Sequence, residues 1–436
     1  MKIMNIAILG FGREGKSVLK FLKKTCLPVG RSPSFQKAKI SVLDKKTDKD
    51  YLKKLPNFDL VFRTPGIPYN LPEIQKAIKN GVKFSSATQL FFEQLRGPTQ
   101  TKCRITRKNI KIIGITGTKG KGTTSTLLYK IFKACKKNAL LAGNIGKSPL
   151  DLIPKLKKNS IVILELSSFQ LQDLKKSPDI AVVLNIFPDH MDSHKNFSEY
   201  LNAKTSIAKF QKKSGKVFYD ASNRYSKLIA QKSKGKKIPV DARHFQYASK
   251  MPGEHNLKNA AIAATVALSL GCPKEKIIKI IKDFKGNEHR LELVRVIRVN
   301  PCKRNALNPC KSVSIKFYND SASTNPQTTI AAINAFKEPK IVILGGKDKG
   351  LNYSPLAQTL KHSNTKLIIL FGENKRKIYK AISNQKLIIR EVKNLQQAVH
   401  LAYKTAKKLS DYKTLSNYET KQLIILFSPA AASFDM

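Results

Sequence analysis

The sequence predicts an α/β protein of three domains: an N-terminal Rossmann-like parallel sheet, a central sheet that carries a phosphate-binding loop, and a C-terminal Rossmann-like α/β domain. Three observations predict this class. Short apolar strands alternate with helical stretches, a glycine-rich turn joins a strand to a helix near residue 117, and a polar stretch at 96–109 separates the first two blocks. We place the domains at 1–105, 106–292 and 293–436.

The first block is typical of parallel βαβ units. Its apolar pattern predicts strands at 3–9, 40–43 and 60–63 and helices at 16–24 and 71–79. Gly10, Gly12 and Gly15 form a GxGxxG pattern after the first strand, which alone indicates a nicotinamide-dependent oxidoreductase. Asp44 ends the second strand, farther along the chain than the roughly 20 residues expected for a nicotinamide ribose contact. The pattern by itself is therefore weak.

The second block contains the strongest local signal, GITGTKGKGTT at 114–124, between a strand predicted at 110–115 and a helix at 123–136. Glycines let backbone N–H groups converge on phosphate oxygens, and a helix N-terminus adds positive potential. The order of strand, loop and helix is that of a P-loop ATPase-type sheet. The residues predicted to bind ATP here are Gly117, Thr118, Lys119, Gly120, Lys121, Gly122 and Thr123.

Lys121 is expected to bridge the β- and γ-phosphates of ATP. The usual pattern places a hydroxyl directly after this lysine, but Gly122 stands there. Thr123, one position later, is therefore the expected Mg²⁺ ligand. Further strands of the central block are predicted at 161–166 and 181–185.

The third block opens with a predicted hairpin, 293–299 and 313–318, joined by an insertion at 300–312. Strands at 340–344, 366–371 and 422–427 then alternate with helices, which indicates another α/β sheet. Cys302 and Cys310 lie in the insertion at a spacing that does not indicate a metal site, so we interpret them as structural or incidental.

Composition and charge exclude several classes. Hydrophobic residues make up 41% and charged residues 25% of the chain, which is typical of globular cores. No signal peptide and no membrane-spanning run is predicted, so we expect a cytoplasmic monomer with no membrane partner. The net charge is +52, from 81 Lys and Arg against 29 Asp and Glu. Because the lysines are spread along the chain without an RNA-binding signature, no specific nucleic-acid partner is predicted.

Several segments resemble the Mur ligases in order and spacing over nearly the whole chain. They are GNIG at 143–146, ELSSFQL at 165–171, NIFPDHMDSH at 185–194, AK at 203–204, GEHN at 253–256, HR at 289–290, NDSASTN at 319–325, GGKDK at 345–349 and SPAAASFD at 428–435. ELSSFQL and SPAAASFD look like the D-glutamate-adding member. The phosphate loop with Gly122 is similar to that of folylpolyglutamate synthases, which lack these two segments and the N-terminal block with TPGI at 64–67.

The resemblance implies an ATP-dependent acid–amino-acid ligase of peptidoglycan precursor synthesis. Its substrates would be UDP-N-acetylmuramoyl-L-alanine, D-glutamate and ATP, its cofactor Mg²⁺ as two ions, and its intermediate an acyl phosphate. Both chemical steps bring anionic groups together, so cations must position and neutralise them.

The resemblance also implies residue roles. Glu165, at the C-terminal end of a predicted strand, and His190, beside two acids, would hold Mg²⁺. Lys204 matches a lysine that Mur ligases carbamylate with CO₂, which would turn it into an anion that helps to place the second Mg²⁺.

Binding residues follow from the same match. Those near ATP are Asn144, Asn256, Asn259, Arg290 and Asp320; those near the UDP substrate are Gly10, Gly12, Gly15, Asp44, Thr64 and Gly66; those near D-glutamate are Thr324, Lys349, Ser433 and Phe434.

The sequence departs from the family pattern at two points. Both bear more on the expected activity than on the resemblance to the family. Ala322 stands where some members have a lysine, and the family continues for a further helix beyond Met436, which leaves open whether the C-terminal domain is truncated. Two alternative functions also stay open. GKGTT favours a folylpolyglutamate synthase-like ligase, and the +52 charge favours a basic, nucleic-acid-binding P-loop NTPase.

Overall fold

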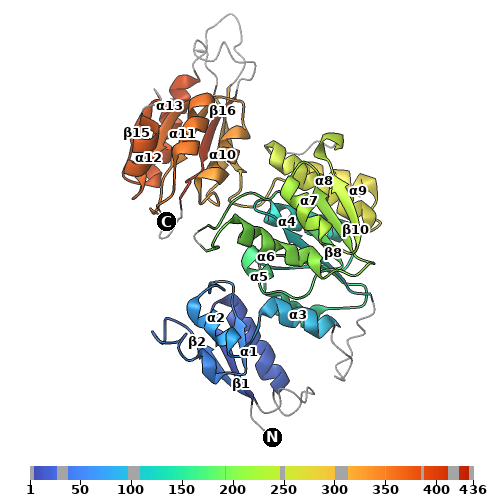
Figure 1. Ribbon diagram of the computed structural model, residues 1–436. Coiled ribbons are helices and arrows are strands. Elements are labelled where there is room, and N and C mark those ends of the chain that lie inside the picture. Colours follow the sequence, from blue (N-terminus) through green and yellow to red (C-terminus); the bar gives the residue numbers. More distant parts are fainter. Residues whose placement is uncertain are drawn as a thin grey trace, which may run out of the picture. The chain divides into compact units, whose positions relative to one another are not determined.

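Three α/β sheets make up the computed structural model, as predicted (Figure 1). The structure describes residues 4–26, 38–96, 109–191, 193–245, 251–299, 313–348, 350–383, 387–410 and 422–431. The chain divides into two compact units. The first unit comprises Met1–Tyr247 and Lys258–Ile281, and the second comprises Ala248–Leu257 and Lys282–Met436.

The first sheet has the strand order β2-β1-β3-β4, and all of its strands are parallel. Its elements are β1 (Met4–Leu9), α1 (Arg13–Cys26), β2 (Ala38–Leu43), η1 (Leu55–Asn57), β3 (Leu60–Arg63), α2 (Pro72–Lys79), β4 (Lys83–Ser85) and α3 (Ala87–Arg96). The predicted alternation of strands and helices is therefore confirmed for this block.

The second sheet has the strand order β10-β9-β8-β5-β7-β6 and is again parallel throughout. Its elements are β5 (Lys111–Thr116), α4 (Lys121–Ala134), β6 (Ala139–Gly143), η2 (Pro149–Lys155), β7 (Ile161–Glu165), α5 (Ser168–Leu171), β8 (Ile180–Val183), α6 (Phe197–Lys209), β9 (Lys216–Asp220), α7 (Arg224–Gln231), β10 (Lys236–Val240) and η3 (Ala242–His244). Strands β7 and β8 are buried along their whole length, as expected for a parallel sheet covered on both faces.

One hydrophobic core joins these two sheets. The cluster contains Ile6 and Phe62 from the first sheet and Val162 from the second, with Phe91 and Phe92 of α3. The two rings of α3 meet edge to face, with their centroids 6.0 Å apart. Because the apolar faces share this core, the first two blocks pack as one unit, which agrees with the division of the chain.

The third sheet has the order β11-β12-β16-β13-β14-β15, in which only the β11–β12 pair is antiparallel. The remaining elements are α8 (Glu254–Ser269), α9 (Lys274–Asp283), β11 (Glu292–Val299), β12 (Val313–Asn319), α10 (Pro326–Asn334), β13 (Lys340–Leu344), α11 (Ser354–His362), β14 (Thr365–Leu370), α12 (Lys375–Ile382), β15 (Ile389–Glu391), α13 (Leu395–Leu409) and β16 (Gln422–Phe427). The predicted hairpin is the antiparallel pair. Cys302, Cys310 and the insertion between the two strands lie outside the described residues.

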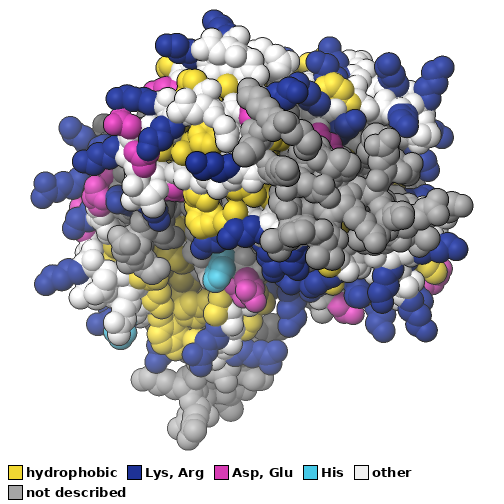
Figure 2. All heavy atoms as spheres, turned by 90° about the horizontal axis from the view of Figure 1, so that it is seen from below, with side chains coloured by type: hydrophobic (Ala, Val, Ile, Leu, Met, Phe, Trp, Pro, Cys, Tyr) yellow, Lys and Arg dark blue, Asp and Glu magenta, His cyan; other side chains and the backbone are white. Residues whose placement is uncertain are grey.

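Figure 2 shows Lys and Arg side chains distributed over the described part of one face rather than gathered in one block. Within the described residues, no helix has the length and apolar character needed to cross a membrane.

Candidate active site

The carboxyl ends of four central strands meet at one edge of the second sheet. Strand β5 lies between β7 and β8, and Ile115 is paired with Glu165, which is itself paired with Gly143 at the end of β6. On the other side Thr116 is paired with Val183 of β8. Because open α/β sheets bind ligands at this edge, the phosphate loop and the segments after β6, β7 and β8 are placed to form one site.

The glycines of the phosphate loop allow close approach of the chain. Gly120 has a φ of +84°, and a Cβ there would lie 2.2 Å from Oδ1 of Asn259. A Cβ on Gly117 would lie 2.7 Å from the Cβ of Leu184. A side chain at either position would push the loop away from Asn259 or Leu184, so glycine is required for the loop to pack closely against these two residues.

Lys121 begins α4 and folds back over the loop. Its Nζ donates to the carbonyl oxygens of Gly117 and Thr118, each at 3.1 Å. Thr123 lies buried in the same first turn. The amine therefore lies directly over the loop, where it can meet phosphate oxygens held by the backbone.

Lys204 of α6 is buried beneath the same loop, with 1% of its surface exposed. Its Nζ donates to the carbonyl of Gly117 at 3.1 Å and to Oγ1 of Thr116 at 3.3 Å, and it lies 4.7 Å from the ring centre of Tyr200. Burial, followed by the positive charge of Lys121, lowers the pKa of Lys204 well below its ordinary value. Burial therefore disfavours the ammonium form of this side chain.

Glu165 ends β7 as a buried carboxylate. Its Oε1 accepts from the side-chain amide of Asn144 at 3.3 Å. Oγ1 of Thr116 donates to the carbonyl of Leu166, the next residue, at 2.9 Å. Lys204 donates to the same hydroxyl, so two successive hydrogen bonds link the buried lysine to Leu166.

The segment after β8 adds charged and aromatic groups. Asp189 pairs with Lys119 of the loop at 3.1 Å, and Oγ1 of Thr118 donates to the carbonyl of Phe187 at 3.0 Å. Burial alone would raise the pKa of Asp189, but Lys119 and His190 outweigh it and lower that pKa. Asp189 therefore contacts the phosphate loop as a carboxylate.

His190 has a half-exposed side chain and a φ of +59°. Its ring lies edge to face against Phe169, with centroids 5.2 Å apart. Phe169 follows Ser168 in the segment after Glu165, so the ring contact joins the segments that follow β7 and β8.

The donor set fits Mg²⁺ held together with phosphate. The carboxylate of Glu165, the amide oxygen of Asn144 and the hydroxyl of Thr123 are hard oxygen donors, and Mg²⁺ usually takes only one or two protein ligands besides water and phosphate. Within the described ranges, no group of three or more His, Cys, Asp and Glu side chains could hold a metal ion by itself.

The N-terminal glycine loop is closed by its neighbours. Gly10 has a φ of +88°, and a Cβ there would lie 2.3 Å from Oγ1 of Thr64. A Cβ on Gly15 would lie 2.2 Å from the carbonyl oxygen of Gly10. Asp44 accepts from the backbone N–H of Phe11 at 2.7 Å. The structure thus brings the loop, the end of β2 and the end of β3 together, while Gly12 and Gly66 have open space where a Cβ would stand.

Sequence reasoning missed a buried ion pair between the first two sheets. Arg63, at the end of β3, donates from Nε to Oδ2 of Asp173 at 2.9 Å, and the two side chains are 1% and 7% exposed. Arg63 also donates to the carbonyls of Ile67 and Phe169, at 2.6 and 2.8 Å. An arginine at the end of a buried strand requires an acidic or hydrogen-bonding partner. This requirement is the feature of the sequence that could have indicated the ion pair.

Glu14, in the first turn of α1, is a second buried acid at this junction. It accepts from the side-chain amide of Gln170 at 2.6 Å. Burial is the largest influence on its carboxyl group, and it raises the pKa of Glu14 above the ordinary value. The folded protein therefore resists ionisation of this group.

We expect Glu14→Gln to change how stability depends on pH. Below the ordinary pKa the carboxyl group is protonated in both the folded and the unfolded protein, so its ionisation does not affect stability. As the pH rises through the folded pKa the wild type loses stability, at about 1.4 kcal/mol for each pKa unit of difference, whereas glutamine cannot ionise. Thermal melts from pH 4 to 9 should show a melting-temperature difference that grows in favour of the variant. A constant difference would contradict the buried-acid assignment.

The second unit holds the remaining predicted residues. Asp320 is buried; its Oδ2 accepts from Ser323 and Ser428, and its Oδ1 accepts from the backbone of Leu291. Burial raises the pKa of Asp320 although the two serines oppose it. Asn256 donates to the carbonyl of Pro252 at 2.7 Å. Asp320 thus joins the ends of β12 and β16, a structural contact that its predicted ATP role did not anticipate.

Arg290 and Thr324 are exposed. Lys349, Ser433 and Phe434 lie outside the described residues. The proposed D-glutamate residues therefore remain predictions.

Comparison with known proteins gives two family models and many relatives. The Mur ligase middle domain matches residues 115–242, and the Mur ligase glutamate ligase domain matches residues 308–412. The chain is 30% identical to UDP-N-acetylmuramoylalanine--D-glutamate ligase of Acetivibrio thermocellus, over 100% of this chain and 93% of that protein. It is 31% identical to the protein of the same name from Ruminiclostridium cellulolyticum, over 100% and 94%.

A solved structure agrees at the level of the fold. The MurF ligase of Thermotoga maritima in complex with ADP is similar with a TM-score of 0.56 and 15% identity, over 99% of this chain and 92% of that one.

Proposed function

Because the chain belongs to the Mur ligase family of ATP-dependent, amide-forming ligases of peptidoglycan synthesis, we propose that it joins D-glutamate to UDP-N-acetylmuramoyl-L-alanine. The observation that carries the proposal is the meeting of Lys121, Lys204 and Glu165 at one edge of the central sheet. The choice of D-glutamate rests on the names of the relatives and on the ELSSFQL segment.

The proposed reaction has two steps. A carboxylate oxygen of the muramoyl-alanine attacks the γ-phosphorus of ATP, and the bond to ADP breaks, which gives an acyl phosphate. The amine of D-glutamate then attacks the acyl carbon, loses a proton, and phosphate leaves. Lys121 and the loop N–H groups would hold the phosphates in line and offset the charge that the two anions bring together.

Mg²⁺ would supply charge neutralisation and orientation of the phosphate oxygens when bound. Thr123 and Glu165 are the proposed ligands of one ion. His190 and a carbamylated Lys204 are the proposed ligands of the second. Asn144 would orient the Glu165 carboxylate through its hydrogen bond.

Lys204 has the environment that carbamylation needs. The neutral amine attacks CO₂, forms the N–C bond and releases one proton, so burial, which lowers the pKa of Lys204 and disfavours its ammonium form, favours this reaction. The product is an anion beneath a loop that already contains Lys119 and Lys121. Both lysines disfavour the ammonium form of Lys204 and would favour the carbamate, since its charge is opposite to theirs.

A substrate panel read as phosphate release tests the proposal. With ATP, Mg²⁺ and UDP-N-acetylmuramoyl-L-alanine, we expect release that depends on D-glutamate and not on L-alanine, meso-diaminopimelate, L-lysine or L-glutamate. Release that depends on a folate and L-glutamate would favour the folylpolyglutamate synthase-like alternative suggested by Gly122. Stimulation by RNA or DNA with a steep salt dependence would favour the nucleic-acid-binding alternative.

We expect Asp44→Ala to weaken binding of the UDP substrate without affecting binding of ATP. Hydrogen bonds from Lys46 and then Phe11 lower the pKa of Asp44, so its carboxylate holds the glycine loop against β2 as a full anion. Loss of a charged hydrogen-bond partner is worth roughly 1.5–3 kcal/mol, so the KM for the UDP substrate should rise about tenfold or more. Steady-state kinetics should show an unchanged KM for ATP. Asp48→Ala, which removes a partly buried ion-pair partner of Lys54, is the matched control.

A further inference from the structure

Arg13 binds a turn of the central sheet from the N-terminal glycine loop. Its Nη1 donates to the carbonyl of Gly146 at 2.7 Å, and its Nη2 donates to the carbonyls of Gly143 and Asn144 at 3.0 and 3.2 Å. Arg13 is the first residue of α1, directly after Gly12 of the GxGxxG pattern. One guanidinium therefore collects three carbonyls of a turn that lies far away in the sequence.

That turn holds Glu165. The backbone N–H of Asn144 donates to the carbonyl of Glu165 at 2.9 Å, and its side-chain amide donates to Oε1 at 3.3 Å. Gly143 has a φ of +110°, and a Cβ there would lie 2.2 Å from the carbonyl oxygen of Glu165. The turn thus fixes both the backbone and the carboxylate of Glu165 from one side, and Arg13 fixes the turn.

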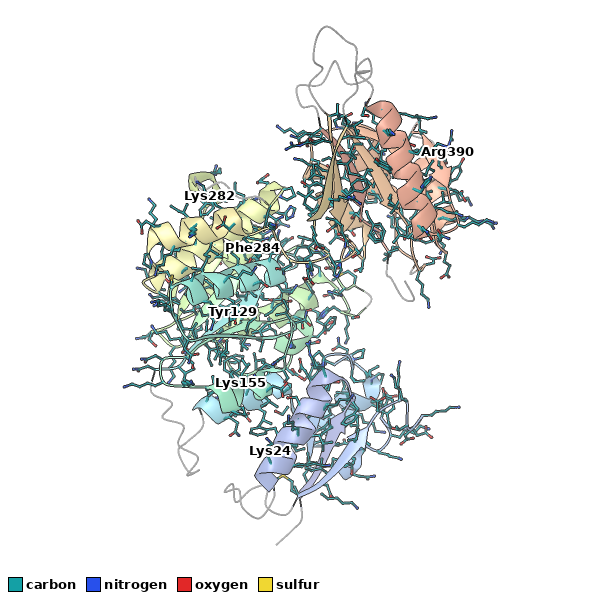
Figure 3. The ribbon with its side chains drawn as sticks, turned by 180° about the vertical axis from the view of Figure 1, so that it is seen from behind. Lys24, Tyr129, Lys155, Lys282, Phe284 and Arg390 are labelled. Carbon is teal, nitrogen blue, oxygen red and sulfur yellow. The ribbon has the colours of Figure 1, made fainter. Side chains whose placement is uncertain are left out.

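The next residue of α1 contacts the segment that follows Glu165. Glu14 accepts from the amide of Gln170, whose Oε1 accepts from the backbone N–H of Ser167 at 3.0 Å. Ser17, one turn on, donates to Asp151 of η2 at 2.8 Å. Lys24 on α1 and Lys155 at the end of η2 mark these two elements in Figure 3.

We propose that Arg13 is a positioning residue that couples occupancy of the N-terminal glycine loop to the placement of the Glu165 carboxylate. The inference rests on the proposed function, in which a UDP group binds that loop and Glu165 serves the Mg²⁺–nucleotide. A ligand whose phosphates bind the N-terminus of α1 restricts its first turn. The planar fork of arginine then transmits the restriction to three carbonyls at once, whereas a lysine at this position presents a single ammonium.

The test measures coupling between two ligands without catalysis. The full-length protein is titrated with Mg²⁺ and a non-hydrolysable ATP analogue by calorimetry, with and without saturating UDP. In the wild type UDP should tighten nucleotide binding about fivefold or more, and the nucleotide should tighten UDP binding by the same factor. Arg13→Gln should bring this factor close to one while each ligand alone still binds. Arg13→Lys should retain part of the coupling.

Arg243→Gln is the matched control, because the side chain of Arg243 is exposed and, among the described residues, forms an ion pair with Asp241; it should keep the wild-type coupling. Full coupling in Arg13→Gln overturns the inference. An Arg13→Gln variant that loses affinity for both UDP and the nucleotide analogue but keeps the wild-type coupling factor also overturns the inference, because that result indicates a merely structural role. Binding of both ligands to the wild type without coupling also overturns it, but leaves the proposed function standing. A wild type that binds neither ligand would contradict the proposed function itself.

Discussion

Lys121→Ala is expected to lower ATP-dependent phosphate release by about a thousandfold, because it removes the cation that lies over the phosphate loop. Nζ of Lys121 lies 3.1 Å from two loop carbonyls, where it can contact the transferred phosphoryl group. Loss of a single preorganised charge-stabilising group costs roughly 10²–10³ in rate, and here the lost group carries a full charge. Steady-state phosphate release with all three substrates is the measurement.

Lys133→Ala provides the control for this prediction. Lys133 lies in the last turn of the same helix, α4, and is exposed. Lys133→Ala changes the net charge by the same amount as Lys121→Ala and should keep wild-type turnover. A Lys121→Ala variant that stays folded and works within about threefold of the wild type, a difference under 1 kcal/mol, would show that the phosphate loop is not the ATP site.

Lys204→Gln is expected to lower turnover about a hundredfold or more, because it removes the group that would carry the carbamate. Loss of a group that places a catalytic metal typically costs 10–100-fold, and a lost ligand costs more than a lost supporting contact. The wild type incubated with ¹³C-bicarbonate should give a carbamate carbon signal by NMR, and the variant should not. Circular dichroism establishes that the variant is folded.

Lys209→Gln is the matched control for that experiment, since Lys209 ends the same helix α6 and is exposed. It should retain both the carbamate signal and the turnover. Wild-type protein that shows no carbamate at saturating bicarbonate, or a Lys204→Gln variant with undiminished turnover, would contradict the assignment. In that case the buried amine of Lys204 would serve only as a hydrogen-bond donor to Thr116 and Gly117.

Local patterns in the sequence predicted the sheets and the end of each key strand. The run 161–164 is continuous and apolar, and the structure places it in β7 (Ile161–Glu165), with Glu165 at the last position of the strand. The phosphate loop was predicted because glycine spacing, lysine and helix start are contiguous in the chain. Such features depend on neighbours within a few residues, so they can be read without knowing the tertiary fold.

Contacts between distant segments could not be predicted in this way. Without the family resemblance Lys204 is one helix lysine among many, and its burial depends on how α6 packs against β5 and the loop. The pair Arg63–Asp173 and the turn held by Arg13 likewise join residues more than a hundred positions apart. Pairing at such distances is decided by the packing of the two sheets, not by local propensity.

Oxygen transfer tests the central claim most directly, namely that this site activates a carboxylate by phosphorylation. UDP-N-acetylmuramoyl-L-alanine labelled with ¹⁸O in its carboxylate is turned over with ATP and D-glutamate, and the released phosphate is analysed by mass spectrometry. An acyl phosphate requires one ¹⁸O atom in each phosphate, because the oxygen that attacked the γ-phosphorus leaves with it. Phosphate released without label, or label found in AMP, would contradict the account.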